Sequence, residues 1–386
     1  MTLLTSGFLT VLSGIVSVFF GLLLLFQTLR LPVVSLVSLI TEPRAVRLSL
    51  TMLIISLVTL LLLLCKQTAA RTVIFIFAVL GLLCALVAVI VNVSVASRHK
   101  ARISIAVALS GEKDSAAADV EIDSYARFGD SDIGLSLWKP KGMDAGAPVI
   151  LYIHGGAWMN DNRFLNGDMH HCRYFAQNGC LTASVDYPLA TKERPMFEHQ
   201  ENTIVQAIAW LRNHAADFGG DTRRFYLTGG SAGGNLALNV AARVNKGEFA
   251  ALLGSDFRVA AVSVLFPATN ITDLYNSASA PLAPLLRSAC KTNWGGSPEE
   301  VPEHYRQNSS DLLADGTMAP VFTVYGKNDH IVPHATVERY LACLDKLGVE
   351  TRRVVFPFAD HLCDTGGSIE AQTWRSLTLR WFNDHG

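Results

Sequence analysis

Residues 225–237 read Phe-Tyr-Leu-Thr-Gly-Gly-Ser-Ala-Gly-Gly-Asn-Leu-Ala, and this stretch decides the fold. A short apolar strand leads into a tight turn that carries Ser231, and small residues typical of a helix start follow it. Gly229 and Gly233 have no Cβ, so the strand and the helix can approach closely there. The pattern is that of a turn that holds a nucleophilic serine clear of the backbone. A glycine-rich turn with an incidental serine is the alternative, and partners elsewhere in the chain decide between the two.

A second glycine-containing loop follows the apolar run 148–153. It reads His-Gly-Gly-Ala-Trp over residues 154–158. Glycines directly after a strand allow backbone N–H groups to point into a cleft, where they can stabilise an oxyanion. A simple tight turn is the alternative. We expect His154 to hold this loop in place rather than to act as a base.

An acid and a base follow two later strands. Asp329 lies in the loop after the predicted strand 321–325, where a carboxylate can orient an imidazole. His361 follows the last predicted strand and is the best candidate for the base. His330 and His334 are rival bases and Asp360 is a rival acid, but adjacent residues rarely orient so as to pair. The chain order Ser231, Asp329, His361 is the order expected for an α/β-hydrolase.

Strand and helix patterns alternate from residue 119 to the end. Strands are predicted at 120–123, 135–138, 148–153, 181–185, 225–228, 259–266, 321–325 and 353–356, and helices at 170–178, 200–216, 335–347 and 370–383. This alternation predicts a mostly parallel, doubly wound sheet. Residues 270–318 interrupt it with several prolines, and we interpret them as part of a lid over the site, with a plain surface insertion as the alternative.

The first hundred residues are too apolar for an ordinary soluble enzyme. The whole chain is 50% hydrophobic and 17% charged, and the excess lies in three uncharged runs at about 8–29, 48–65 and 72–96. Each run is long enough to cross a bilayer, so we predict three transmembrane helices in region 1–100. Residues 101–118 are expected to form a linker, and residues 119–386 the catalytic domain.

The basic residues that flank these runs predict an orientation. They are concentrated in the loop after the first run and in the segment after the third, namely Arg30, Arg44, Arg47, Arg98, Lys100 and Arg102. Because such residues favour the cytoplasmic side, the large domain is expected there, in a multi-pass membrane protein. The net charge of −1 gives no indication of nucleic-acid binding. The seven cysteines show no metal-ligand spacing, and we expect no metal, no cofactor and reduced thiols.

The motifs resemble those of the α/β-hydrolase superfamily, in particular the hormone-sensitive-lipase-like esterases. Residues 230–234 resemble their nucleophile motif, 154–158 their His-Gly-Gly loop in its tryptophan variant, and 186–190 a structural motif in which Pro188 replaces the usual arginine. The resemblance covers residues 119–386 and does not include the apolar region. It implies that the backbone N–H groups of Gly155, Gly156 and Ala232 form an oxyanion hole.

These observations together predict a membrane-anchored serine hydrolase. Ser231, His361 and Asp329 would form a triad that cleaves small-molecule or lipidic acyl esters through an acyl-enzyme. An acyltransferase, an amidase or a formamidase could use the same triad. A catalytically inactive binding module is the non-enzymatic alternative, and the presence of all three triad residues argues against it.

Overall fold

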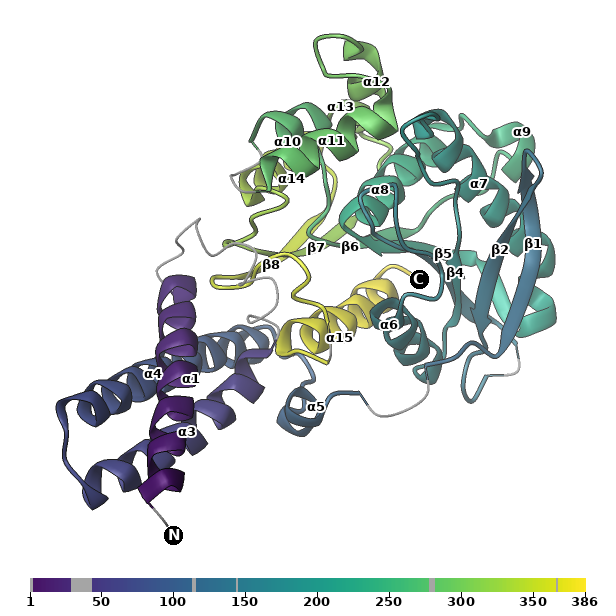
Figure 1. The fold of residues 1–386 in the computed structure, drawn as a ribbon. Helices are drawn as coiled ribbons and strands as arrows, with labels where there is room; N and C mark the ends of the chain where they lie inside the picture. Colours follow the sequence, from purple (N-terminus) through teal and green to yellow (C-terminus); the bar gives the residue numbers. More distant parts are fainter. Residues whose placement is uncertain (1–2, 29–43, 113–115, 144, 278–281, 366) are drawn as a thin grey trace. The chain divides into compact units, whose positions relative to one another are not determined.

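The structure is a computed structural model that describes residues 3–28, 44–112, 116–143, 145–277, 282–365 and 367–386 (Figure 1). The chain forms two compact units. Unit 1 contains Met1–Lys113, Gly326–His330 and Val355–Thr373, and unit 2 contains Asp114–Tyr325, Ile331–Val354 and Trp374–Gly386. The predicted boundary near residue 119 is therefore close to the first of several crossings between the units.

An eight-stranded sheet organises unit 2. Its strands are β1 (Val120–Phe128), β2 (Ser131–Trp138), β3 (Ala147–Ile153), β4 (Leu181–Val185), β5 (Gly220–Gly230), β6 (Ala261–Leu265), β7 (Val321–Gly326) and β8 (Thr351–Phe356). Their order is β1-β2-β4-β3-β5-β6-β7-β8. The β1–β2 and β2–β4 pairs are antiparallel, whereas β4–β3, β3–β5, β5–β6 and β6–β7 are parallel. The prediction of a mostly parallel sheet is confirmed.

Helices cover both faces of this sheet. The main ones are α6 (Asn166–Gln177), α7 (Phe197–His214), α8 (Ser231–Lys246), α14 (His334–Lys346) and α15 (Ile369–Asp384), with short η3 (Ala215–Phe218) and α9 (Ala250–Leu253). Figure 1 shows α7 and α8 on one side of the sheet and α6 and α15 on the other. On the latter side the ring of Trp374 contacts Phe175 of α6 and Tyr152 of β3, at centroid distances of 5.9 and 6.4 Å. A buried aromatic layer therefore joins these helices to the sheet.

Where the structure describes it, at 270–277 and 282–318, the insertion contains α10 (Ile271–Ser277), α11 (Ala283–Trp294), α12 (Pro302–Gln307) and α13 (Ser310–Leu313). The end of this insertion is bonded to α8. The Asn235 amide donates to the Asn308 carbonyl at 3.0 Å, and the Ser310 hydroxyl donates to Asn239 at 2.6 Å. These bonds are buried, so they fix the C-terminal end of the insertion to the helix that follows Ser231.

The apolar region lies in unit 1 and forms α1 (Leu3–Thr28), α3 (Ala45–Cys65) and α4 (Ala69–Arg98). Within the described residues, α3 and α4 are long and apolar enough to cross a membrane, while the apolar stretch of α1 is the shorter Gly7–Leu22. Two of the three predicted spans therefore have candidate helices, and the first is not confirmed. Leu29, the last residue of the first predicted span, lies outside the described residues. Arg30, which is counted in predicting the orientation, lies outside them as well.

Small residues let these helices pack closely. A Cβ on Gly21 of α1 would lie 2.6 Å from the Phe77 carbonyl oxygen of α4, and one on Gly81 would lie 3.1 Å from the Gly21 Cα. Close contact at small residues is a common mode of helix association in membranes. Many of the large apolar side chains of these helices face outward, and Leu61 and Ile90 are each 62% exposed. Outward-facing apolar side chains suit a lipid environment.

The predicted linker 101–118 is not wholly irregular, because it contains α5 (Ile105–Ser110). Ala108 of α5 is buried in an apolar cluster with Ala96 and Ile369. The sequence prediction missed this helix because it is short and its apolar face becomes evident only through its partners.

Candidate active site

Ser231 lies where β5 ends and α8 begins. Its φ angle is +55°, in the left-handed region that non-glycine residues adopt rarely. Strain of this kind concentrates at functional sites, where surrounding contacts hold it in place. Ala232 is the second residue of α8, so its N–H belongs to the first turn, whose amide groups have no partner within the helix. The predicted strand-turn-helix around the serine is present.

Two glycines make this turn sterically feasible. A Cβ on Gly229 would lie 2.4 Å from the Ile153 carbonyl oxygen, and one on Gly233 would lie 2.0 Å from the same atom. This oxygen is a backbone atom, which cannot rotate away as a side chain can. The start of α8 therefore packs directly against the end of β3.

The His154–Trp158 loop lies beside Ser231 in unit 2. A Cβ on Gly155 would lie 3.6 Å from the Ser231 Cβ and 3.2 Å from the Gly230 carbonyl oxygen. Gly156 has a φ angle of +102°, and Ala157 also adopts a positive φ, so the loop turns sharply here. The structure thus brings Gly155, Gly156 and Ala232 into one region next to the serine.

His154 stabilises the His154–Trp158 loop through its buried ring. Its ring is buried, stacks on Tyr187 at a centroid distance of 4.3 Å, and lies 2.8 Å through Nδ1 from the Gly155 carbonyl oxygen. Burial lowers the pKa of His154, which favours the neutral ring. The Tyr187 hydroxyl is 2.9 Å from the His154 carbonyl oxygen and 3.1 Å from that of Gly155. The structural role expected for His154 agrees with these contacts.

Gln200 is a further support that the sequence did not reveal. Its side-chain amide donates to the carbonyl oxygens of Trp158 and Pro188, at 3.1 and 3.0 Å. It thereby ties the end of the loop to the 186–190 motif. Tyr187 belongs to that motif and could have been singled out, whereas nothing in the sequence distinguishes Gln200 from other helical glutamines.

Asp329 and His361 form a buried pair within unit 1. Asp329 Oδ2 lies 2.8 Å from His361 Nδ1, and the two side chains are 1% and 3% exposed. The loops that carry them are bonded together, because the Asn328 N–H donates to the Ala359 carbonyl at 3.1 Å. A Cβ on Gly326 would lie 1.9 Å from that same oxygen, so the close approach of the loops requires glycine. The contact through Nδ1 makes Nε2 the basic atom of the ring.

The pKa of His361 is raised above its ordinary value of 6.5. Burial alone would lower it, but the charge of Asp329 and the hydrogen bond to it favour the imidazolium and outweigh burial. An imidazole with these surroundings is a stronger base than a solvated one. It can accept a proton from a hydroxyl group and retain it while a neighbouring anion forms.

A second carboxylate–imidazole pair lies beside the first. Asp360 is completely buried and lies 2.7 Å from His330 Nδ1. Its Oδ1 also accepts the backbone N–H groups of His330 and His361, at 3.0 and 2.7 Å. The doublets Asp329-His330 and Asp360-His361 therefore interlock, and each aspartate contacts a histidine ring of the other loop. Sequence reasoning weighed Asp360 only as a rival acid and missed this pair. The third candidate base, His334, is the first residue of α14.

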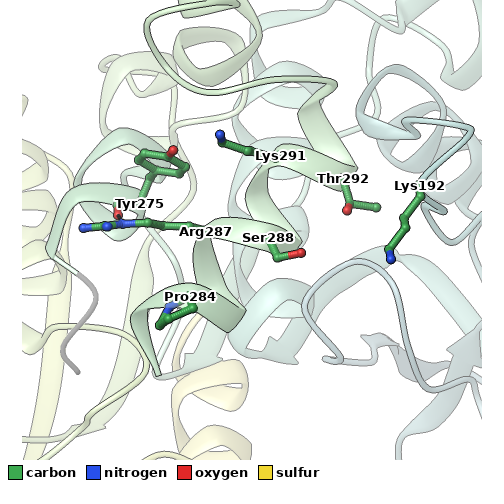
Figure 2. Close-up of a pocket in the computed structure, with 7 residues that line it drawn as sticks. All are labelled: Lys192, Tyr275, Pro284, Arg287, Ser288, Lys291 and Thr292. Carbon is green, nitrogen blue, oxygen red and sulfur yellow. Dashed lines mark hydrogen bonds between the residues drawn. The ribbon is translucent and has the colours of Figure 1, made fainter. Parts of the chain in front are cut away.

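A separate pocket of about 620 Å³ lies on the insertion in unit 2 (Figure 2). It is lined by Lys192, Tyr275, Pro284, Arg287, Ser288, Lys291 and Thr292. Figure 2 shows Lys192 and Arg287 at opposite ends of this lining. None of the predicted catalytic or oxyanion residues contributes to it. No group of three or more His, Cys, Asp or Glu side chains suited to a metal ion occurs among the described residues.

Comparison with known proteins identifies the family. The BD-FAE family model matches residues 135–342, more than half of the chain, and the chain belongs to this family. A probable carboxylic ester hydrolase, LipM of Mycobacterium tuberculosis, is 28% identical over 257 residues, which cover 64% of this chain and 57% of LipM. Esterase LipC of the same organism is 28% identical over 234 residues, covering 59% and 56% of the two chains. The chain thus spans little more than half the length of these relatives.

Solved structures show the same fold. An esterase of Thermogutta terrifontis, determined with propionate bound, superposes with a TM-score of 0.54 at 19% identity, covering 68% of this chain and 93% of its own. Esterase B of Lactobacillus rhamnosis gives 0.55 at 23% identity, with 67% and 83% covered. The sheet order and these superpositions define an α/β-hydrolase fold.

Proposed function

We propose that the protein is a carboxylic ester hydrolase in which Ser231, His361 and Asp329 form a catalytic triad. The buried contact of 2.8 Å between Asp329 and His361 is the observation that carries this proposal. The strained serine at the end of β5 and the esterase names of the relatives support it. Gly155, Gly156 and Ala232 are proposed to donate backbone N–H groups to the oxyanion.

Chain connectivity supports the meeting of the serine with the acid–base pair. β5, β6 and β7 are parallel neighbours, and the register pairs Gly230 with Leu265 and Leu265 with Val324. The ends of β5 and β7 thus lie at one edge of the sheet, about 10 Å apart at the usual strand spacing. Asp329 comes a few residues after β7, and each extended residue spans roughly 3.5 Å, so this short link can cover the distance to the end of β5. The covalent link therefore allows Asp329 and His361 to reach Ser231.

The proposed reaction uses only groups of this chain, the ester and water. Nε2 of His361 accepts the proton of the Ser231 hydroxyl as the oxygen attacks the ester carbonyl. The imidazolium then returns the proton to the leaving alcohol, and the acyl group remains on the serine. A water molecule, deprotonated by the same nitrogen, releases the carboxylic acid and restores the enzyme. Asp329 stabilises the imidazolium in both halves of the cycle.

The oxyanion hole lowers the barrier of both acyl-transfer steps. Negative charge develops on the carbonyl oxygen only as the tetrahedral intermediate forms, and rigid N–H donors stabilise it there. His154, Tyr187 and Gln200 would keep the Gly155–Gly156 segment in position before the substrate binds.

We further propose that the apolar region anchors the enzyme in a membrane through α1, α3 and α4, with the catalytic domain on the cytoplasmic side. The length and apolarity of α3 and α4 support the anchoring. The position of the insertion between β6 and β7 supports a lid role for residues 270–318, because loops after such strands surround the site in α/β folds. Small or lipidic esters are the substrate class that such an enzyme would meet.

Hydrolysis of p-nitrophenyl esters of increasing acyl length tests the activity. The full chain in detergent is compared with Ser231→Ala, and Ser255→Ala in an exposed loop serves as the matched control. We expect activity in the wild type and the control, and a loss of at least a thousandfold in Ser231→Ala. Equal activity in all three proteins would refute the assignment.

A further inference from the structure

The apolar helices and the proposed acid–base loops belong to the same compact unit. Unit 1 contains the apolar region together with the segments 326–330 and 355–373, which carry Asp329 and His361. A membrane anchor that only tethers an enzyme needs no contact with the catalytic residues. Contacts within unit 1 connect the apolar helices to the chain around His361.

The first contact joins α4 to the start of α15. Asn92 of α4 is 2% exposed, and its side-chain amide donates to Oε1 of Glu370, which is also 2% exposed. A buried amide and a buried carboxyl group on an apolar helix surface are costly to desolvate unless they bond to each other. This pair therefore fixes the register of α4 against residues 369–373, the part of α15 that belongs to unit 1.

The second contact joins the chain after α4 to the same first turn of α15. The backbone N–H of Ser104 donates to Oε1 of Gln372 at 2.6 Å, and Nε2 of Gln372 donates to the Ser104 carbonyl at 3.1 Å. Ile369 is buried against Ala96 and Ala108 beside these bonds. The side chains of Glu370 and Gln372 are thus held by two different parts of the region before residue 111.

The start of α15 is in turn bonded to the segment that follows His361. The Ser368 hydroxyl donates to the Cys363 carbonyl at 2.5 Å, and Nε2 of Gln372 also donates to the Gly367 carbonyl at 2.8 Å. Leu362, next to His361, has a φ angle of +63°, which marks a sharp turn. These bonds therefore tie Cys363, two residues after the histidine, to the start of the helix that Asn92 contacts.

The length of α4 is compatible with these contacts in a membrane protein. Its 30 residues span about 45 Å, whereas the hydrocarbon core of a bilayer is about 30 Å thick. The last turns, which include Asn92 and end at Arg98, can therefore extend beyond the core. Glu370 would meet Asn92 at the membrane surface rather than within the lipid.

We propose that the α4–α15 contact, formed by Asn92, Ser104, Glu370 and Gln372, positions His361 for catalysis. The apolar region is then a structural part of the catalytic machinery and more than an anchor. Asn92 and Glu370 are positioning residues, since they act through the start of α15 and its bond to Cys363. The catalytic meaning of this contact rests on the proposed function, but its mechanical effect on the His361 segment does not.

Hydrogen–deuterium exchange of residues 357–365 and steady-state kinetics test the proposal on the full chain in detergent. The variants are Asn92→Ala and Glu370→Ala, with Glu370→Gln as the conservative variant that keeps an oxygen acceptor for Asn92. Ser94→Ala, on the same helix, is the matched control because its hydroxyl bonds to the Ile90 carbonyl of its own helix. Residues 225–237 of unit 2 report on global unfolding.

Both alanine variants are expected to exchange about tenfold faster at 357–365 and to lose about tenfold in kcat, with KM within about twofold of the wild type. Glu370→Gln and Ser94→Ala are expected to stay within about twofold in all three quantities. If Asn92→Ala also accelerates exchange at 225–237, Glu370→Asp, which only shortens the acceptor, takes its place. Unchanged exchange at 357–365 in the alanine variants would overturn the proposal. Faster exchange with no esterase activity in the wild type would instead contradict the proposed function and leave the mechanical coupling standing.

Discussion

Replacing Gly233 by alanine tests how tightly the start of α8 is packed against β3. The added Cβ would lie 2.0 Å from the Ile153 carbonyl oxygen and 2.4 Å from that of His154. Contacts below 3.0 Å are essentially never seen for a Cβ, so the helix start has to move by about 1 Å. Because the obstacles are backbone atoms of β3 and of the His154–Trp158 loop, the movement displaces Ser231 relative to that loop.

The expected cost follows from this displacement. Overpacking in a well-packed core costs roughly 1–3 kcal/mol, and occasionally more. The upper end, about 3 kcal/mol, applies because the clash is with backbone atoms, and alanine regains up to about 1 kcal/mol of helix propensity, which leaves a net destabilisation of about 2 kcal/mol. A shift of about 1 Å in a catalytic group can cost about a hundredfold in rate, and kcat/KM should fall by that order.

Gly167→Ala is the matched control. Gly167 is also helical, in α6, and nothing lies within 4 Å of its added Cβ. This variant should gain or lose less than about 1 kcal/mol and keep full activity. Denaturant unfolding and p-nitrophenyl ester hydrolysis measure both effects. A Gly233→Ala protein with wild-type stability and activity would refute the reasoning about the turn.

The value of kcat/KM should fall on the acidic side of the pH profile, with a midpoint above 6.5, because the pKa of His361 is raised and only its neutral ring is a base. Asp329→Asn should move this midpoint to lower pH and reduce kcat by about a thousandfold or more. By linkage, the protonated pair stabilises the fold below the ordinary histidine pKa, and this contribution disappears as the pH rises through the raised value, which urea titrations at several pH values can follow. Tyr187→Phe, which removes the hydroxyl bonded to the His154–Gly155 carbonyls, should lower kcat several-fold and stability by about 1 kcal/mol, and a variant that matches the wild type in both kinetics and thermal unfolding would contradict that role.

The sequence contained most of the information about the sheet. β4 was predicted at its observed limits, and the other strands differ from their predictions mainly in length, because apolar runs show where a strand is buried but not how far it extends. The strand-turn-helix at Ser231 could be predicted because the turn itself requires glycine. These glycines stand within a few residues of the serine in the sequence. The order of Asp329 and His361 along the chain likewise pointed to the pair that the structure shows.

The contacts that support the site could not be predicted in this way. Three such contacts join residues that are far apart in the sequence. They are the Asp360–His330 pair, the hydrogen bond from Gln200 to the Trp158 carbonyl and the hydrogen bond from Asn92 to Glu370. A single sequence has no periodicity or motif that reports such a pairing. For the same reason α5 was taken as a linker, since Ala108 becomes a core residue only beside Ala96 and Ile369.

The identity of the residue that becomes covalently modified by paraoxon tests the central claim most directly. An organophosphate phosphorylates a serine rapidly when a neighbouring base activates its hydroxyl group, so rapid labelling of Ser231 requires the assembled triad rather than the serine alone. Peptide mapping by mass spectrometry should find a diethylphosphoryl group on Ser231 in the wild type, and none or only a trace in His361→Ala. An adduct on another residue, or equal labelling of Ser231 in the His361→Ala protein, would contradict the account.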